Sequence, residues 1–246
     1  MRRKSLLSAI IAIGTLSMTL QSCLNDDDDN IDMSLPTALV TVRPNPDGSF
    51  IMQLDNVTQL IPDNLTKSPF GTKEVRALVN YTENGNHGPN DLVRNVRVNW
   101  IDSICTKLPV KSLGEDNNIK FGNDPIEIIN DWVTVAEDGY LTLRIRTLWG
   151  NTDTHHIINL LADTNPDNPY ELEIRHDAQG DAAGHWGDAL IAFNLNGLPR
   201  PDDDKATITL KWKSFTGSKT AEFKLQMRPD GRGIDTDNIL YTNSLK

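Results

Sequence analysis

The amino-acid sequence predicts an all-β protein, because short segments of alternating apolar and polar residues are separated by residues that favour turns. Alternation with a period of two is typical of a strand with one buried face. It recurs in the segments 96–100, 170–175, 206–213 and 221–227. Pairs that favour tight β-turns lie between such segments, at Asp47-Gly48, Asn84-Gly85 and Asp138-Gly139. No long segment has a convincing helical repeat, so we expect strands throughout.

The same alternation predicts which tryptophans enter the core. Val96, Val98 and Trp100 fall on one face of their segment. Trp212 has the same kind of apolar companions in the segment 206–213. We therefore expect Trp100 and Trp212 to be core residues.

A polar stretch at 109–124, rich in Gly, Pro, Asn and Asp, has the composition of a linker and divides the chain. The five strand segments expected before it lie near 37–43, 49–54, 57–62, 74–83 and 91–105. Five strands in that length favour an OB-like five-stranded barrel, which we place at 36–110. Seven or eight short strands after the stretch favour an antiparallel β-sandwich at 118–229. The state of the tail at 230–246 stays open.

The N-terminus has the features of a bacterial lipoprotein signal. Residues 1–22 combine three basic residues with an apolar stretch that is shorter than a membrane span, which is typical of a secretory signal peptide. A small residue, Ser22, precedes Cys23, and Leu20 to Cys23 resembles a lipobox. We expect acyl chains, palmitate among them, on Cys23, and several chains together anchor a protein firmly. The alternative is an ordinary signal peptide with an incidental cysteine.

The acidic tether at 23–35 contains a run of four like charges, Asp26, Asp27, Asp28 and Asp29. Like charges repel and keep a chain extended, so the run serves as a spacer. It also resembles the export signal of surface lipoproteins in Bacteroidetes, although it starts later after the cysteine. We therefore expect a protein anchored by lipid in the outer membrane and facing the cell surface.

Composition excludes several classes of function. The chain has 24 Lys+Arg against 34 Asp+Glu, a formal charge of −10, which argues against a nucleic-acid partner. Two cysteines cannot form a disulfide scaffold. Cys105 ends an alternating segment, and a buried small hydrophobe is its expected role. No nucleophile motif or cofactor motif is present, so we expect no enzyme and no cofactor.

The remaining candidate residues are histidines and tryptophans. His176 and His185 lie among Asp177, Asp181 and Asp188, but no known metal spacing matches, so we expect a polar hairpin connection and no metal. His155 and His156 are adjacent in a strand-like segment, and we expect His156 to pack beside Ile158 and Leu160. Trp149 and Trp186 each precede a glycine in expected loops, where a tryptophan ring can stack on a sugar.

Several segments resemble the NigD-like lipoproteins of Bacteroidetes. The resemblance covers about residues 20–230 and rests on the lipobox, the acidic run and six segments, 37–56, 74–83, 93–109, 122–150, 155–163 and 172–181. It implies an N-terminal OB-like domain followed by a β-sandwich, and it implies no catalytic residues. It favours a non-catalytic, lipid-anchored envelope lipoprotein that binds protein partners and is associated with bacteriocin immunity. The alternative is a surface carbohydrate-binding lipoprotein that uses Trp149 or Trp186.

Overall fold

The computed structural model describes residues 34–88, 90–151 and 153–228. The signal peptide at 1–22, Cys23, Asp26 to Asp29 and the tail at 230–246 lie outside the described residues. The described chain folds into a closed barrel and two further sheets, which confirms the all-β prediction. No helix in the described ranges is long and apolar enough to cross a membrane.

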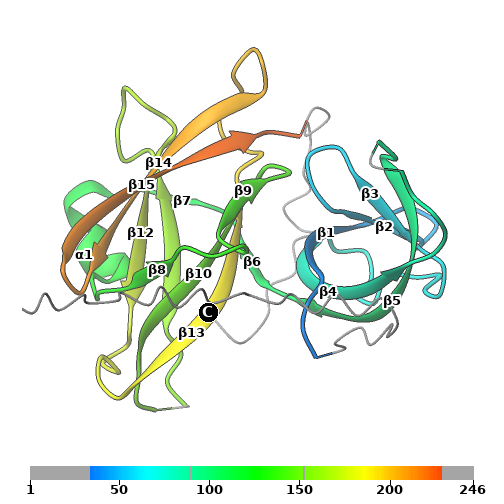
Figure 1. Ribbon diagram of the computed structural model, residues 1–246. Coiled ribbons are helices and arrows are strands. Elements are labelled where there is room, and N and C mark those ends of the chain that lie inside the picture. Colours follow the sequence, from blue (N-terminus) through cyan, green and yellow to red (C-terminus); the bar gives the residue numbers. More distant parts are fainter. Residues whose placement is uncertain (1–33, 89, 152, 229–246) are drawn as a thin grey trace, which may run out of the picture. The chain divides into compact units, whose positions relative to one another are not determined.

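The first domain is a barrel of five strands, close to the five predicted segments. Its elements are β1 (Ala38–Pro44), β2 (Phe50–Gln53), β3 (Gln59–Pro62), β4 (Val75–Glu83) and β5 (Val93–Ser103) (Figure 1). They pair in the order β1-β2-β3-β5-β4, and β4 also pairs with β1 to close the barrel. Apolar side chains from all five strands fill the interior, among them Val40, Met52 and Leu60, each 0% exposed.

A β-bulge in β5 changes one predicted face. Asn80 of β4 pairs with Trp100 while its neighbour Tyr81 pairs with Val98, so Asn99 is an extra residue in the strand. An extra residue shifts the alternation by one position. Ile101 therefore packs against the barrel core, and Trp100 is only half-buried. The prediction that Trp100 is a core residue is wrong for this reason.

The second domain is a β-sandwich of two sheets. The first has the order β6-β13-β10-β8, with β9 also on β10, and the second has the order β15-β14-β12-β11-β7. The strands of the first sheet are β6 (Cys105–Lys107), β8 (Glu127–Ile129), β9 (Val135–Glu137), β10 (Tyr140–Trp149) and β13 (His185–Asn194). Those of the second are β7 (Val110–Lys111), β11 (Ile157–Ala162), β12 (Glu171–Asp177), β14 (Lys205–Ser214) and β15 (Gly217–Gln226). Most pairs are antiparallel, but β12 and β14 pair in parallel.

The predicted alternation explains the sandwich core. Leu172 and Ile174 of β12 and Ile208 and Leu210 of β14 are buried, as is Trp212. These side chains meet Leu141, Leu143 and Ile145 from β10 of the facing sheet. Trp212 is 8% exposed and belongs to this cluster, as predicted. Cys105 is 2% exposed and packs in the same core.

The chain passes from barrel to sandwich earlier than the expected boundary at residue 110. β5 ends at Ser103, and β6 begins at Cys105 and pairs in parallel with β13 of the sandwich. The sequence reads as one strand here because Ile104 and Cys105 continue the apolar pattern. The stretch at 109–124 is not a free linker, since β7 pairs with β11 and a short helix α1 (Asn117–Phe121) contacts β11 and β12.

Candidate functional site

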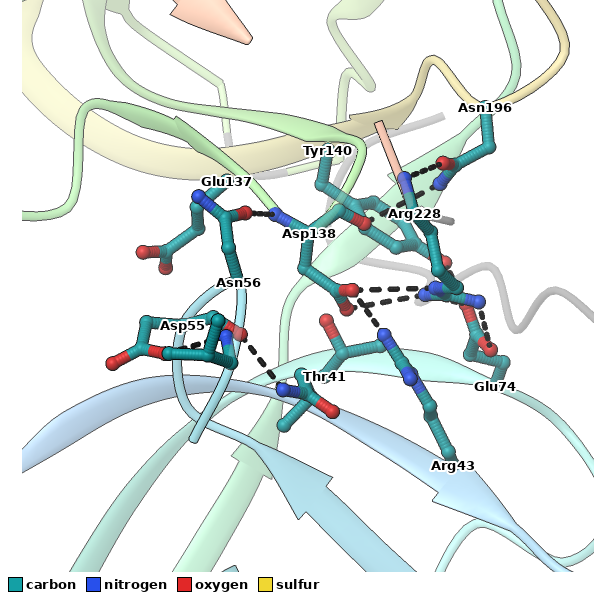
Figure 2. A network of polar contacts seen from close by, with 12 residues as sticks. Thr41, Arg43, Asp55, Asn56, Glu74, Glu137, Asp138, Tyr140, Asn196 and Arg228 are labelled. Carbon is teal, nitrogen blue, oxygen red and sulfur yellow. Dashed lines mark hydrogen bonds and ion pairs between the residues drawn. The ribbon is translucent and has the colours of Figure 1, made fainter. Parts of the chain in front are cut away.

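A buried polar network joins the barrel to the sandwich, and Figure 2 shows it from close by. Its centre is Asp138, which is 3% exposed and lies in the turn between β9 and β10. The Asp138 carboxylate accepts a hydrogen bond from Arg43 of β1 and two from Arg228, at 3.1 and 3.2 Å. Asn56, between β2 and β3, accepts a hydrogen bond from the Asp138 backbone N–H at 2.8 Å. The turn predicted at Asp138-Gly139 is therefore also the joint between the domains.

The network continues through two further pairs. Arg76 of β4 is 0% exposed and donates to Thr41 at 2.9 Å and to Glu137 at 2.8 Å. Burial raises the pKa of Glu137, and the neighbouring Arg76 guanidinium only partly offsets this effect. The Tyr140 hydroxyl donates to Glu74, and burial together with that carboxylate raises the pKa of Tyr140 well above its usual value.

Shifted pKa values often mark active sites. Here each carboxylate is in contact with an arginine or a tyrosine hydroxyl, so the shifts follow from ion pairing at a domain joint. Leu39, Ile104, Tyr140 and Ala192 form an apolar cluster at the same joint. We interpret the network as the structure that fixes the two domains to each other, not as a reacting site.

The histidines of the sandwich form a second cluster. His156 and His176 are each 1% exposed, and Nδ1 of His156 lies 2.9 Å from Nε2 of His176. Nδ1 of His176 lies 3.1 Å from the Pro125 carbonyl oxygen, to which it donates. Burial lowers the pKa of His176. The prediction that His156 packs inside is confirmed.

Asp181 connects this cluster to the neighbouring loop. Its carboxylate accepts hydrogen bonds from the backbone N–H groups of Gly150 and Asn151 at 2.9 to 3.0 Å, and these bonds lower its pKa. His185 is exposed at the start of β13, where it pairs with Trp149. Within the described ranges, no three His, Cys, Asp or Glu side chains come together as a metal site.

The sequence predicts a loop at Trp149, but Trp149 is the last residue of strand β10. Its ring stacks on His156 with a centroid separation of 4.0 Å, and Nε1 donates to the Gly187 carbonyl oxygen at 3.1 Å. A side chain at Gly187 would overlap the Trp149 ring, since an added Cβ would lie 2.4 Å from it. Trp149 is thus a packed residue at the end of the sandwich, and this packing makes it less suited to stack on a sugar.

Trp186 also lies in a strand, but it is exposed. It belongs to β13 and is 57% exposed. Its ring contacts Phe215, which is 38% exposed in the turn between β14 and β15, edge to face at 4.9 Å. Trp132, between β8 and β9, is 56% exposed. Large exposed aromatic side chains that gather in one region mark interaction sites more often than single ones do.

Two arginines connect these aromatic residues into one surface. Leu148, Arg146 and Arg144 of β10 pair with Trp186, Asp188 and Leu190 of β13, so these six side chains share the outer face of the sheet. Arg144 donates to Asp188 at 2.8 Å and to Asp131, the neighbour of Trp132, at 2.8 Å. We call this surface the aromatic–arginine face; its residues are Asp131, Trp132, Arg144, Arg146, Trp186, Asp188 and Phe215.

Electrostatics fix the centre of the aromatic–arginine face. Arg146 donates to Asp188 at 2.5 and 2.9 Å, and with Arg144 it lowers the pKa of Asp188 to about 2. The guanidinium groups are consequently held in place while remaining partly exposed. A hollow of about 210 Å³ lies beside them, and Trp132, Val133, Leu190 and Pro36 contribute to its walls.

Sequence reasoning found Trp186 but missed the rest of this face. The alternation Leu141, Leu143, Ile145, Thr147, Trp149 in β10 contains the signal, because it places Arg144 and Arg146 outward and Trp149 inward. The pairing of β10 with β13 is a long-range fact that no local pattern specifies.

The fold and the site define a two-domain all-β protein. It consists of a closed five-stranded barrel and a β-sandwich, and the sandwich carries the exposed aromatic–arginine face. A model described as the NigD-like N-terminal OB domain matches residues 39–104, and one described as the NigD-like C-terminal beta sandwich domain matches residues 109–225. The chain belongs to the NigD-like family, which confirms the resemblance.

Solved structures agree with this assignment. A protein described as toxin-related from Parabacteroides distasonis is similar at 31% identity and a TM-score of 0.64, over 79% of this chain and 93% of that one. A NigD-like immunity protein from Bacteroides caccae shares the fold at 20% identity and a TM-score of 0.56, over 78% of this chain and 97% of that one. A protein of unknown function from Bacteroides vulgatus shares it at 19% identity and a TM-score of 0.58, over 85% and 98%. No curated protein matches the chain.

Proposed function

We propose that this protein is a non-catalytic, lipid-anchored lipoprotein of the cell envelope, and that its aromatic–arginine face binds a protein partner. The observation that carries the proposal is the exposed Trp186–Phe215 pair, continued through Arg146 and Arg144 to the exposed Trp132. Trp and Arg are among the residues that contribute most to binding at protein interfaces. Asp188 holds both guanidinium groups in place before a partner arrives, which lowers the entropy cost of binding.

The alternative, carbohydrate capture by stacking, has less support from the structure than from the sequence. It relied on two tryptophans, and one of them, Trp149, is packed against His156 and Gly187. Trp186 remains exposed, but its ring is in contact with Phe215. A ligand of this surface has to match paired charges as well as aromatic rings, and these are features of a protein interface.

The place of action follows from the N-terminus. We propose that Cys23 is lipidated, that the run Asp26 to Asp29 directs export, and that the protein is held in the outer membrane with its domains at the cell surface. The relatives described as an immunity protein and as toxin-related support a role in bacteriocin immunity, in which the partner is a toxin or a component of its secretion. The variant Cys23→Ala is expected to leave the membrane fraction; retention there contradicts lipid anchoring.

The experiment is in-cell crosslinking of the lipoprotein, followed by detergent extraction and mass spectrometry of what copurifies. One dominant protein is expected, and the pair of changes Trp132→Ala and Trp186→Ala is expected to reduce its recovery at least about tenfold, since residues of this kind contribute about 2 kcal/mol or more. The matched control is Ile119→Ala, because Ile119 is 87% exposed on α1 and lies outside the aromatic–arginine face.

Three results would contradict the proposal. If the double tryptophan variant recovers as much partner as the parent does, the aromatic–arginine face does not bind that partner. Quenching of tryptophan fluorescence by a neutral oligosaccharide, lost in Trp186→Ala, supports the carbohydrate alternative instead. Turnover of any glycan or peptide by the purified protein would contradict its non-catalytic nature.

A further inference from the structure

The outer surface of the other sheet carries a groove with a different chemistry. The groove has a volume of about 650 Å³ and extends from α1 across β12 and β14 to the start of β15, elements that lie side by side in Figure 1. Glu173 of β12 pairs with Lys211 of β14, while their neighbours Leu172 and Leu210 are buried in the core. Glu173 and Lys211 therefore point outward, and the groove lies on the solvent face of this sheet.

Positive charge predominates in the groove. Three cationic side chains, Arg175, Lys211 and Lys213, and one carboxylate, Glu173, line it on this face; Lys219 also borders the groove, but it pairs with Trp212 and lies on the other face of the sheet. Outside the lining, Glu171 pairs with Lys211 at 2.6 Å and Glu127 lies 3.6 Å from Lys219. Lys213 donates to the Asn123 carbonyl oxygen at 2.7 Å, and no carboxylate of the described chain pairs with it. The groove is thus a local cationic surface on a protein whose formal charge is −10.

Side chains on the α1 side of the groove are held in place. Arg175 donates to Asn118 at 2.6 Å and to Asn123 at 3.2 Å, and it pairs with Glu173 at 3.0 Å. Asn118 belongs to α1, which packs on β12, and Asn123 lies just after that helix. This cationic wall exists before any ligand binds, so little side-chain entropy is lost on binding.

The rest of the lining selects the kind of anion. Ser218 and Thr220 add hydroxyl groups and Asn118 and Asn123 add amides, whereas the Trp212 side chain is buried in the sandwich core. An acidic peptide would be held better by apolar pockets for its side chains, whereas hydroxyls, amides and cations match the oxygen atoms of a sugar acid. We propose that this groove binds an extended anionic glycan, through its carboxylate or sulfate groups.

The test measures binding of the purified full-length lipoprotein, in detergent, to immobilised polygalacturonate and to chondroitin sulfate. The two probes separate carboxylate from sulfate as the recognised group. Binding to at least one is expected, and it should weaken as salt rises, because screening shortens electrostatic range from about 10 Å at 0.1 M to about 3 Å at 1 M. The double variant Lys211→Gln, Lys213→Gln is expected to bind at least about fivefold more weakly.

The control is Lys224→Gln, since Lys224 lies on β15, the strand next to β14, but donates to Thr207 outside the groove. It removes one positive charge outside the groove, where the double variant removes two inside it, and it should leave binding unchanged. Equal loss in Lys224→Gln means that net charge alone attracts the glycan, and it overturns the proposal. Absence of binding to both probes at low salt overturns it too. So does binding of polyglutamate that is as tight as binding of either glycan, because the groove then selects charge and not sugar.

Discussion

Both terminal nitrogens of Arg228 donate to the Glu74 carboxylate, at 3.0 Å each, although 154 positions separate the two residues. Glu74 directly precedes β4 of the barrel, and Arg228 follows β15 of the sandwich. Burial by itself would lower the pKa of Arg228, but the neighbouring Glu74 and Asp138 carboxylates outweigh it and raise that pKa above its usual value, so Arg228 stays charged at the joint. The end of the second domain is therefore fastened to the first.

The variant Arg228→Met removes this fastening while it keeps most of the side-chain volume. It leaves the Glu74 carboxylate, which is 19% exposed, without its arginine partner. It also removes the two hydrogen bonds that Arg228 donates to Asp138. Breaking a buried pair by removing one partner costs about 3 to 5 kcal/mol, so we expect the free energy of unfolding to fall by about 3 kcal/mol. Denaturant unfolding measures this free energy, with Arg228→Met compared with its parent and Cys23→Ala present in both proteins.

The matched control is Glu83→Gln, which breaks the more exposed pair between Glu83 and Arg94 in the barrel. Exposed pairs contribute less than about 1 kcal/mol, so this variant should unfold almost as the parent does. Equal effects of the two changes would mean that the joint adds no stability of its own.

Gly139 tests the turn beside Asp138. Its φ is +73°, and an added Cβ would lie 2.0 Å from the Asn196 side chain. Both backbone strain and overlap therefore oppose Gly139→Ala, and we expect a loss of at least about 2 kcal/mol in unfolding free energy. Gly48 has a φ of +86° with nothing within 4 Å of an added Cβ, so Gly48→Ala should cost only the backbone strain, about 1 kcal/mol. A Gly139→Ala effect no larger than that of Gly48→Ala would show that Asn196 moves aside.

Local patterns of sequence predicted the strands and turns of this fold because each strand buries one face only. The alternation at 206–213 placed Ile208, Leu210 and Trp212 inward, where they are. The Asp138-Gly139 pair predicted a turn, and both residues have positive φ there. Such features depend on neighbours within a few positions, which a sequence displays directly.

Features that depend on distant pairing were not predictable. The bulge at Asn99 is defined by the register with β4, and no residue in β5 signals it. Arg146 and Asp188 meet because β10 pairs with β13. Trp149 was misplaced for a different reason: a glycine follows it, which suggested a loop, whereas Gly187 on the partner strand provides the space for its ring.

Trp149 and Trp186 should respond differently to replacement by alanine. Trp149→Ala removes the stacking on His156 and the hydrogen bond to Gly187, so we expect a loss of about 2 to 3 kcal/mol in unfolding free energy. Trp186→Ala removes an exposed side chain that contacts Phe215, and a loss below about 1 kcal/mol is expected. Thermal and denaturant unfolding of both variants measures the difference. The reverse order would place Trp149 outside the packed structure.

His176 makes stability depend on pH, and stability is lost as the pH falls below about 6.5. The ordinary histidine pKa is 6.5, and burial lowers the pKa of His176 in the folded protein, against the weaker opposing effects of the Pro125 carbonyl, Asp124 and Asp177. Below pH 6.5 the unfolded chain binds a proton that the folded protein does not. The free energy of unfolding therefore falls as the pH drops through 6.5, by at most about 1.4 kcal/mol per pH unit for one proton, and levels off below the folded pKa.

Denaturant unfolding at pH 5.5, 6.5 and 7.5 tests this dependence. His176→Gln should flatten the slope over this range even where it lowers stability at every pH, because the readout is the change with pH and not the absolute value. His185→Gln is the control, since His185 is exposed whereas His176 is buried. A slope that survives His176→Gln but disappears in His185→Gln would transfer the pH dependence from the core to the surface.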